Sequence, residues 1–433
     1  MIRGLSKINR YLLAAAGAIG ILAAGGISAK AATLEQLEAA IADLQQQVKE
    51  AKAAAAAAQA AAANAGGNDL DLKVKWKGAP EFSSGDGKFK MKIRGRLQAD
   101  YNAIDQDQAI TGRPDVSAAE FRRARLGVEG VVFYTVEYKF EIDFANDVVS
   151  IKDAYLEYTG LADGLGLRFG NYKTFNTLDD MTSSRFITFL ERAAFIEAWG
   201  FDRQIGAAAI YAKDHYTLSA GIFGPRSADD ERWLEDVKTA AARITLAPIN
   251  REVNSVHQVV HLGASWRDRD QAEHLRASNT LNPFADQFFQ YRARGADLHL
   301  ADRFVSTPQI FDHDTFWGLE AAVIWGPWYA VGEYTQLEAE VSPLFAGSDP
   351  TYNGWYVETG WFITGESRGY KEGEFVRTKV KNPVLGGGHG GGWGAWEISG
   401  RYDVLDLTDK ALALQGNVAG AVGPTSVNCT LCG

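Results

Sequence analysis

The sequence is poor in several features that mark common protein classes. It has 2 cysteines, 3 methionines and 11 prolines among 433 residues, and its formal net charge is −10. So few cysteines exclude a disulfide-rich scaffold, and the negative charge gives no general electrostatic reason to bind nucleic acid. Beyond residue 30, no apolar run reaches the roughly 18 residues that a membrane helix needs. Glycine, with 45 residues, and aromatic residues, at 11%, are plentiful.

The N-terminus has the pattern of an export signal. The first part is basic and contains Arg3, Lys7 and Arg10. An apolar run follows over residues 11–24, and Ala29 to Ala31 supply a small-residue cleavage pattern. A retained membrane anchor is the alternative, but the run is short and rich in alanine. We predict a signal peptide over residues 1–31, which leaves a secreted, periplasmic or outer-membrane protein.

A helical segment follows the predicted cleavage site. Apolar residues recur at alternating three- and four-residue steps from Leu34 to Ala55, which is the seam of a coiled coil. The rest of the segment is rich in Ala, Glu, Gln and Lys, all good helix formers. We predict a coiled coil over residues 32–64, with a single solvated helix as the alternative, and a linker over residues 65–84.

The longest strand pattern begins at Lys88 and ends at Asn102, where apolar residues alternate with basic and other polar ones. Successive side chains of a strand point to opposite faces, so one face is apolar and the other is largely basic. The stretch between Phe89 and Tyr101 spans about 28 Å when tilted by about 45°, close to the apolar height of an outer-membrane barrel. We predict a barrel strand whose basic face lines a water-filled lumen.

The same alternation recurs along the chain as far as residue 407. It appears in residues 123–130, 136–144, 152–158, 165–172, 204–211, 216–223, 240–246, 256–267, 288–294, 315–325, 328–334, 354–363 and 393–405. The strands of a soluble β-sandwich also alternate apolar and polar residues. The export signal, the dense charges of both signs on the polar faces, and the tryptophans and tyrosines near strand ends favour a membrane protein. The predicted fold is an all-β transmembrane barrel over residues 85–407.

Motifs that suggest an enzyme or a metal site are weak. Gly365 to Gly369 match the G-x-S-x-G of a hydrolase elbow, but no helix signal follows Ser367. His257 and His261 share a strand face about 13 Å apart, too far to share a metal ion, and His389 lies in a glycine-rich loop. Five carboxylates are interpreted as solvated lumen lining: Glu137, Glu141, Asp143, Asp153 and Glu157. We predict no catalytic residue, no metal site and no cofactor.

Six basic residues on two neighbouring strands form the strongest candidate site. They are Lys90, Lys92, Arg94 and Arg96 on the first strand and Arg123 and Arg125 on the next. Neighbouring strands lie about 4.8 Å apart, so these side chains form one basic wall. Rings of lysine and arginine favour anions in pores, and arginine can bind phosphate or carboxylate through two donors. The alternative is an ordinary lumen whose basic wall faces an acidic one.

The stretch from Lys173 to Arg203 does not alternate. It carries charges of both signs, at Asp179, Asp180, Arg185, Glu191 and Arg192. We predict that this segment folds into the lumen and narrows it.

Six stretches together resemble the phosphate-selective porin O and P family. They are FRRARLGVEG (residues 121–130), MTSSRFITFLERA (181–193), HLGASWRDR (261–269), GLEAAVIWGP (318–327), FITGESRGY (362–370) and GAWEISGRYDVLDL (394–407). The resemblance covers about residues 85–407. It implies a homotrimer of roughly 16-stranded barrels in the outer-membrane lipid of a Gram-negative bacterium, with the coiled coil in the periplasm. It also identifies residues 173–203 as the constriction loop and the GESRG motif as structural.

The end of the chain departs from this family pattern. Residues 408–433 are interpreted as a loop that ends near Cys429 and Cys432, which we expect to form a small disulfide loop. The family continues with further strands, and a barrel with unpaired backbone groups in lipid is not viable. We therefore expect the sequence to be incomplete, with a truncated protein as the alternative. One edge of the strand Lys88–Asn102 should then be unpaired or paired out of register.

These patterns favour a passive porin for small hydrophilic solutes, with a bias towards anions such as phosphate. A structural role is the alternative, in which the coiled coil and barrel tether envelope layers and the pore is incidental. An enzyme embedded in the barrel would need a nucleophile and a base that the sequence does not supply.

The basic wall leads to a first prediction. Reversing two of its charges, with Lys92→Glu and Arg94→Glu together, should shift the zero-current potential of the pore towards cations, because the lumen loses positive charge. The potential is measured in planar bilayers under a salt gradient. An unchanged potential would place both residues outside the permeation path.

Overall fold

The computed structural model divides the chain into two units, residues 1–70 and 71–433. The structure describes residues 46, 49–50, 72–76, 78–105, 114–227, 238–253, 256–271, 288–294, 298–303, 305–385, 391–409, 421–422 and 426–432. In the first unit, the described residues Gln46, Lys49 and Glu50 are helical, and Gln46 Nε2 donates to Glu50 Oε1 at 2.9 Å. The predicted signal peptide lies outside the described residues, as does the seam of the predicted coiled coil.

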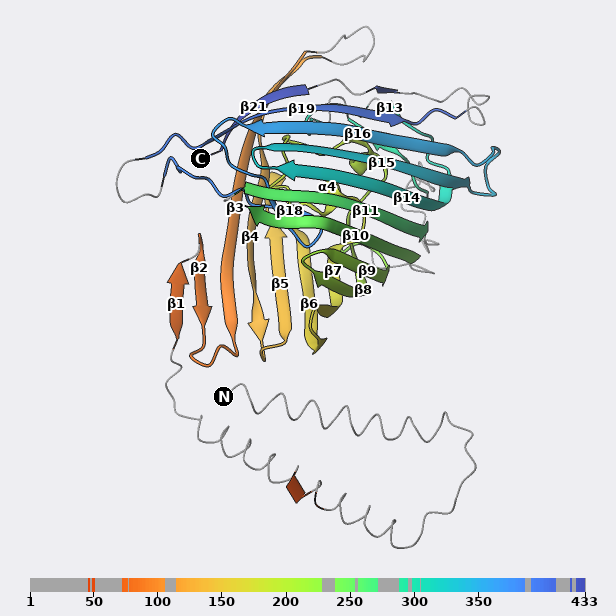
Figure 1. Ribbon diagram of the computed structural model, residues 1–433. Helices are drawn as coiled ribbons and strands as arrows, with labels where there is room; N and C mark the ends of the chain where they lie inside the picture. Colours follow the sequence, from red (N-terminus) through yellow and green to blue (C-terminus); the bar gives the residue numbers. More distant parts are fainter. Residues whose placement is uncertain are drawn as a thin grey trace, which may run out of the picture. The chain divides into compact units, whose positions relative to one another are not determined.

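Among its described residues, the second unit contains one antiparallel sheet of 17 strands (Figure 1). Its strands are β1 (Lys73–Trp76), β2 (Pro80–Ser83), β3 (Lys90–Ile104), β4 (Val116–Val132), β5 (Val136–Asp143), β6 (Ser150–Ala162), β7 (Leu165–Lys173), β8 (Arg203–Lys213), β9 (Tyr216–Phe223), β10 (Lys238–Val253), β11 (Val256–Asp270), β14 (Phe311–Trp325), β15 (Trp328–Val341), β16 (Thr351–Phe362), β19 (Ala395–Asp406), β20 (Ala421–Val422) and β21 (Ser426–Cys432). Two small hairpins lie outside it, β12 (Arg292–Ala293) with β13 (Val305–Ser306) and β17 (Gly369–Lys371) with β18 (Glu374–Val376). Short helices are η1 (Ala145–Asp147), α4 (Leu178–Met181) and α5 (Ala194–Ala198). Within the described ranges, no helix combines the length and apolar character that a membrane span requires.

Consecutive strands pair with their neighbours from β3 to β11 and from β14 to β19. Residues 174–202, which connect β7 to β8, contact both β3 and β19, the first and the last strand of this series. Arg96 of β3 donates to Ser184 Oγ at 3.0 Å, and the amide of Ala194 donates to Asp403 of β19 at 2.9 Å. The sheet therefore curves around this segment, and Figure 1 shows the orange and yellow strands turning through green into blue.

Strand alternation decides which side chains face the inside of this curve. In β15, residues from Tyr329 to Ala339 alternate between buried and more exposed positions, and the buried set includes both Leu337 and Glu333. Outward-facing positions of the neighbouring strands β14 and β16 include exposed apolar residues, among them Leu319 at 54% and Val357 at 53%. An apolar outer face, together with buried charged residues such as Glu333 on the inner face, fits a set of strands that meets lipid on the outside and carries polar groups on the inside.

The first long strand has different partners on its two edges. On one edge, β3 pairs with β4 along its whole length. On the other, it pairs with β2 only at Lys90, Met91 and Lys92. Among the described residues, no ladder joins β3 to β19 or β21. This pairing agrees with the expectation of an incompletely paired edge.

One of the predicted strands is wrong. Residues 288–294 do not cross the sheet; they form a bridge at Phe289 and the short strand β12. Their apolar side chains pack inside the curve, where Tyr291 is only 1% exposed and contacts Trp199, Phe311 and Tyr352. An extended segment that packs inward carries the same alternation as a membrane strand.

Two assignments near the ends of the unit also need correction. The predicted linker over residues 65–84 contains the β1–β2 hairpin, which extends the sheet beside β3. The predicted loop over residues 408–433 contains β20 and β21, both paired with β19. Cys429 and Cys432 both lie in β21, where a three-residue separation places their Cα atoms about 10 Å apart. That spacing is beyond the roughly 7 Å limit for a disulfide, so the predicted disulfide loop is incompatible with this strand.

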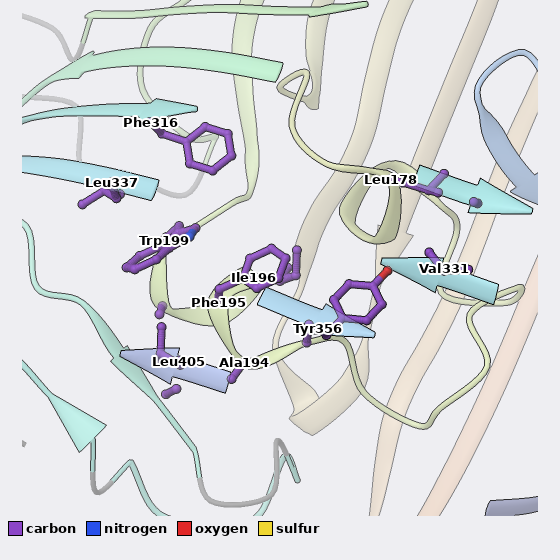
Figure 2. Close-up of a cluster of buried hydrophobic side chains, with 14 of the residues drawn as sticks. Leu178, Ala194, Phe195, Ile196, Trp199, Phe316, Val331, Leu337, Tyr356 and Leu405 are labelled. Carbon is purple, nitrogen blue, oxygen red and sulfur yellow. The ribbon is translucent and has the colours of Figure 1, made fainter. Parts of the chain in front are cut away.

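Residues 174–202 pack on the inner face of β14 to β19. Phe195 and Trp199 are 0% exposed, and Figure 2 shows them among Phe316, Leu337 and Leu405 from the strands. The indole Nε1 of Trp199 also donates to Thr335 Oγ1 at 3.0 Å. The segment is therefore anchored by a hydrophobic core that lies inside the sheet.

This anchor leads to a second prediction. Trp199→Ala should release residues 174–202 from the sheet, because a buried tryptophan truncated to alanine costs about 3–5 kcal/mol. Trypsin should then cut folded protein at Arg185 and Arg192, while far-ultraviolet circular dichroism still reports the sheet. Trp328→Ala, an outward-facing tryptophan that is 55% exposed, is the control. Equal resistance of the two variants would contradict the anchoring role.

Candidate functional site

A polar cavity of about 420 Å³ lies between residues 174–202 and the strands at the start of the sheet. Ten basic and five acidic side chains line it, an excess of five positive charges. The basic residues are Arg96, Arg122, Arg123, Arg125, Lys139, Arg168, Lys173, Arg185, Arg192 and Arg203, and the acidic ones are Glu141, Asp153, Asp180, Asp202 and Glu374. The protein is acidic overall, so this concentration of positive charge is a local product of the fold.

A β-bulge places two consecutive arginines on the same side of β4. Gln98 pairs with Arg123, but Ala99 pairs with Phe121, so Arg122 is the extra residue. Regular alternation would point Arg122 away from the cavity. Instead, Arg122 Nη2 donates to Glu191 Oε2 at 2.9 Å, and Arg123 Nη2 lies 3.7 Å from the same oxygen.

Carboxylates on the neighbouring strands hold several of these cations in place. Arg125 bonds Glu141 at 3.0 Å and Asp143 at 2.7 Å. Further along the wall, Asp153 bonds Arg203 at 2.6 Å and also pairs with Lys139. Arg168 pairs with Glu157 at 2.6 Å and stacks on Tyr155 and Tyr172. These carboxylates lie on the inner face as predicted, but they are not solvated lining. Asp143, Asp153 and Glu157 are buried in ion pairs, because each faces a cation on a neighbouring strand.

The opposite side of the cavity is formed by residues 174–202. Arg192 acts as a brace within this segment, because its guanidinium donates to the carbonyls of Asp179 at 2.8 Å and Thr182 at 2.7 Å. Ser184 contributes its hydroxyl to the bond with Arg96, and Arg185 is exposed to the cavity. The segment thus adds both charge and hydroxyl groups to the strand wall.

The two adjacent aspartates of this segment face different surroundings. The amide of Asp179 donates to Glu333 at 2.8 Å, and burial raises the pKa of the Asp179 carboxyl. Burial also acts to raise the pKa of Asp180, but the charges of Lys173 and Arg192 outweigh it and hold the pKa below its ordinary value. Asp180 lies 3.2 Å from Lys173 and lines the cavity. Asp179 instead packs against the opposite side of the sheet, where its amide contacts Glu333 of β15.

A second segment fills the interior from the other end of the strands. Its described residues are 363–385 and 391–394, and they include the β17–β18 hairpin. Arg368 bonds Glu358 of β16 at 2.9 Å, and its Nη2 donates to the carbonyl of Phe186 at 3.4 Å. The amide of Phe375 donates to Thr182 Oγ1 at 3.3 Å. The two inward segments therefore meet inside the sheet, and together they bury the inner face of β10 to β19.

The six basic residues predicted from sequence separate into two groups. Arg96, Arg123 and Arg125 line the cavity. Lys90, Lys92 and Arg94 occupy the same face of β3 nearer its first residue and do not line it; Arg94 pairs with Glu129. Of the predicted loop residues, Asp180, Arg185 and Arg192 line the cavity, while Glu191 pairs with Arg122 and Asp179 packs behind.

Sequence reasoning missed several residues that line the cavity. Arg168 and Arg203 lie in regular strands, and the alternation of residues 165–172 contained the signal for Arg168. The doubled arginine at 122–123 was a signal for the bulge. No local pattern pointed to Glu374, because a remote hairpin delivers it.

Ser367, His257 and His261, which belong to the candidate enzyme and metal motifs, lie in structural positions. Ser367 lies between β16 and the β17–β18 hairpin, so the strand-to-helix elbow of a hydrolase is not formed there. His261 bonds Tyr370 at 2.7 Å and Glu320 at 3.0 Å, and His257 contacts Asn250 at 3.3 Å. Within the described part of the chain, no cluster of histidine, cysteine or carboxylate residues could hold a metal ion. His389 lies outside the described residues.

Comparison with known proteins gives consistent matches. The family model of phosphate-selective porin O and P matches residues 91–423. An uncharacterized protein of Caulobacter vibrioides is 33% identical over 355 residues, which are 78% of this chain and 65% of that protein. Porin O of Pseudomonas aeruginosa is 30% identical over 352 residues, 78% of this chain and 77% of that protein. A solved anion-selective porin from Comamonas acidovorans aligns at 9% identity with a TM-score of 0.35, over 79% of this chain and 98% of that one.

The division of the basic residues leads to a third prediction. Arg96→Gln should lower the anion preference of the pore by about twofold or more, because a charge that lines a narrow space is weakly screened. Arg94→Gln is the matched control: it removes the same charge from the same face of the same strand, outside the cavity. The zero-current potential in a potassium chloride gradient should move less in the control. A larger shift for Arg94→Gln would contradict the placement of the permeation path.

Proposed function

The chain belongs to the phosphate-selective porin O and P family, and we propose that it forms a water-filled outer-membrane channel for passive diffusion of small hydrophilic solutes, anions in preference. In this proposal, residues 1–31 are a cleaved signal peptide and residues 32–64 are a periplasmic coiled coil. The curved sheet closes into a barrel, and three copies assemble in the outer membrane. Phosphate is the first candidate solute, because the description of the family names it.

The outer surface of the sheet supports the membrane location. Its exposed apolar residues form a band between two sets of outward-facing aromatic side chains. One set lies near the short turns and includes Trp325, Trp328 and Trp361; the other lies towards the opposite strand ends and includes Trp266, Trp317 and Trp355. Trp328 and Trp361 stack with ring centroids 4.9 Å apart. Aromatic girdles on both sides of an apolar band are the pattern of outer-membrane barrels.

The observation that carries the anion preference is the charge of the cavity. Ten basic side chains line the cavity against five acidic ones, and the basic groups stay in excess when the paired carboxylates Asp143, Glu157 and Glu191 are included. This excess makes the space attractive to anions, and eight of the ten basic residues are arginines. Arginine presents several N–H donors in a fixed plane, which suits the oxygens of phosphate or carboxylate. The Ser183 and Ser184 hydroxyls on the opposite wall can donate to the same oxygens.

The packing of the two inward segments supports one route through the lumen. The inner side chains of β14 to β19 are covered, with Thr335, Leu337 and Tyr352 at 0% exposed. Some inner side chains of β3 to β8 remain partly open, as for Lys139 at 23% and Arg168 at 22%. Solutes therefore pass along the basic strands, between them and residues 174–202.

This proposal gives a fourth prediction. Purified full-length protein added to planar lipid bilayers should produce stepwise ion currents whose zero-current potential favours chloride over potassium. Phosphate added to the chloride solution should lower the current in a saturable way, because both anions use the same arginine-lined space. Single-channel recording measures both effects.

Each outcome tests a separate part of the proposal. Membranes that show no conducting steps would overturn the channel function. Conducting steps with no reduction by phosphate would remove the phosphate preference and leave the porin. Sulfate at the same ionic strength is the control, since it separates recognition of phosphate from a general effect of a divalent anion.

A further inference from the structure

Glu374 is the one acidic residue that reaches the cavity from the β17–β18 hairpin. The other four acidic residues of the cavity lie on the strands or on residues 174–202. Glu141, Asp153 and Asp180 form ion pairs there, and Asp202 accepts a bond from the amide of Arg203. Within the described part of the chain, the Glu374 carboxylate has neither an ion pair nor a hydrogen bond. It is an uncommitted negative charge in a space with an excess of positive ones.

The residues beside Glu374 hold the β17–β18 hairpin in place. Arg243 Nη2 donates to the carbonyl of Gly373 at 2.8 Å, and the amide of Phe375 donates to Thr182 Oγ1 at 3.3 Å. The guanidinium carbon of Arg368 lies over the Phe375 ring, 3.8 Å from the centroid of that ring. Tyr370, on the other strand of the hairpin, bonds His261 at 2.7 Å. The hairpin is thus held on both sides of Glu374 by bonds that do not involve its carboxylate.

The charges that act on Glu374 come from three strands of the sheet. Burial raises the pKa of this carboxyl, while the positive charges of Arg243, Lys173, Arg168 and Lys139 oppose that rise. Lys139, Arg168 and Lys173 line the cavity together with Glu374. The same cations that attract a permeating anion therefore also attract this carboxylate.

We propose that Glu374 is a built-in counter-anion that offsets part of the positive charge on the β5–β7 side of the permeation path. Its carboxylate competes with permeating anions for Lys139, Arg168 and Lys173, and so sets how strongly the channel prefers and retains them. A tethered carboxylate weakens retention, which allows a bound anion to leave. This inference rests on the proposed channel function, which it deepens by naming a residue that limits anion selectivity.

The chemistry of the hairpin separates this role from a structural one. A carboxylate that held the hairpin in place would bond to it or to its surroundings, and Glu374 does neither. Replacing the carboxylate with an amide of the same shape removes the charge and keeps the volume. The hairpin should therefore stay folded in Glu374→Gln, and only the electrostatic potential of the cavity should change.

The fifth prediction compares Glu374→Gln with the unaltered full-length protein in planar bilayers. The ratio of chloride to potassium permeability, from the zero-current potential in a salt gradient, should rise by about twofold or more, because one negative charge leaves a weakly screened space. The phosphate concentration that halves the chloride current should fall, since phosphate no longer competes with the carboxylate. Glu374→Asp, which keeps the charge, should retain most of the original selectivity.

Glu338→Gln is the matched control, because it removes a glutamate charge from the outward face of β15. Its permeability ratio should match that of the unaltered protein. If the unaltered protein conducts with anion preference and Glu374→Gln has the same ratio, the inference about Glu374 is wrong and the channel function stands. If the unaltered protein does not conduct, the channel function itself fails. Should Glu374→Gln not assemble, Glu374→Ala must show the same rise, and failure of both to fold would show that the carboxylate is structural.

Discussion

The packing of residues 174–202 against β14 to β19 is the interaction on which the rest of the interior depends. Phe195 and Trp199 bury their side chains completely among residues from several strands. Truncating one such aromatic residue costs a few kcal/mol, so the segment is held far more firmly than a solvated loop. Because it is anchored on one half of the curved sheet, the free space is left beside the other half.

The positive charge of the cavity follows from this asymmetric packing, because the packing decides which charged side chains stay in contact with the cavity. Strands β14, β15 and β16 carry the buried acidic residues Glu320, Glu333 and Glu358. Each of them is bonded by a residue of a strand or of an inward segment. These carboxylates are removed from the solvent path. The basic residues of β3 to β8 remain in contact with the cavity. A chain with a net charge of −10 can therefore present a positive passage, because burial selects which charges a solute meets.

Much of the sheet could be predicted from sequence because alternation is a local property. A residue at every second position must share a face, so twelve of the predicted stretches beyond the first correspond to strands of the sheet. The stretch 288–294 failed for the same reason: alternation reports an extended chain with one apolar face, and Tyr291 satisfies it by packing inward. The linker over 65–84 was wrong because β1 and β2 have only four residues each, too few for a clear alternation, and form a hairpin beside β3.

The candidate site was only partly predictable. The sequence placed Arg96, Arg123 and Arg125 on one face, and all three line the cavity. It could not separate them from Lys90 and Lys92, because the end of the cavity along β3 depends on residues 174–202. The β-bulge in β4 turns the side chain of Arg122 to the cavity side of the strand. This bulge can be recognised only from the register of β3 against β4.

Residue order alone was enough to predict most strands of the sheet, the apolar and polar faces of those strands, and the resemblance to a porin family. These follow from periodicity and local motifs, which do not depend on distant contacts. The tertiary structure decided which half of the interior is filled, how far the cavity extends along the basic strand, and that Glu374 enters it from a hairpin almost 200 residues beyond Asp180. Contacts between remote segments control these features, and no local pattern encodes where two such segments will meet.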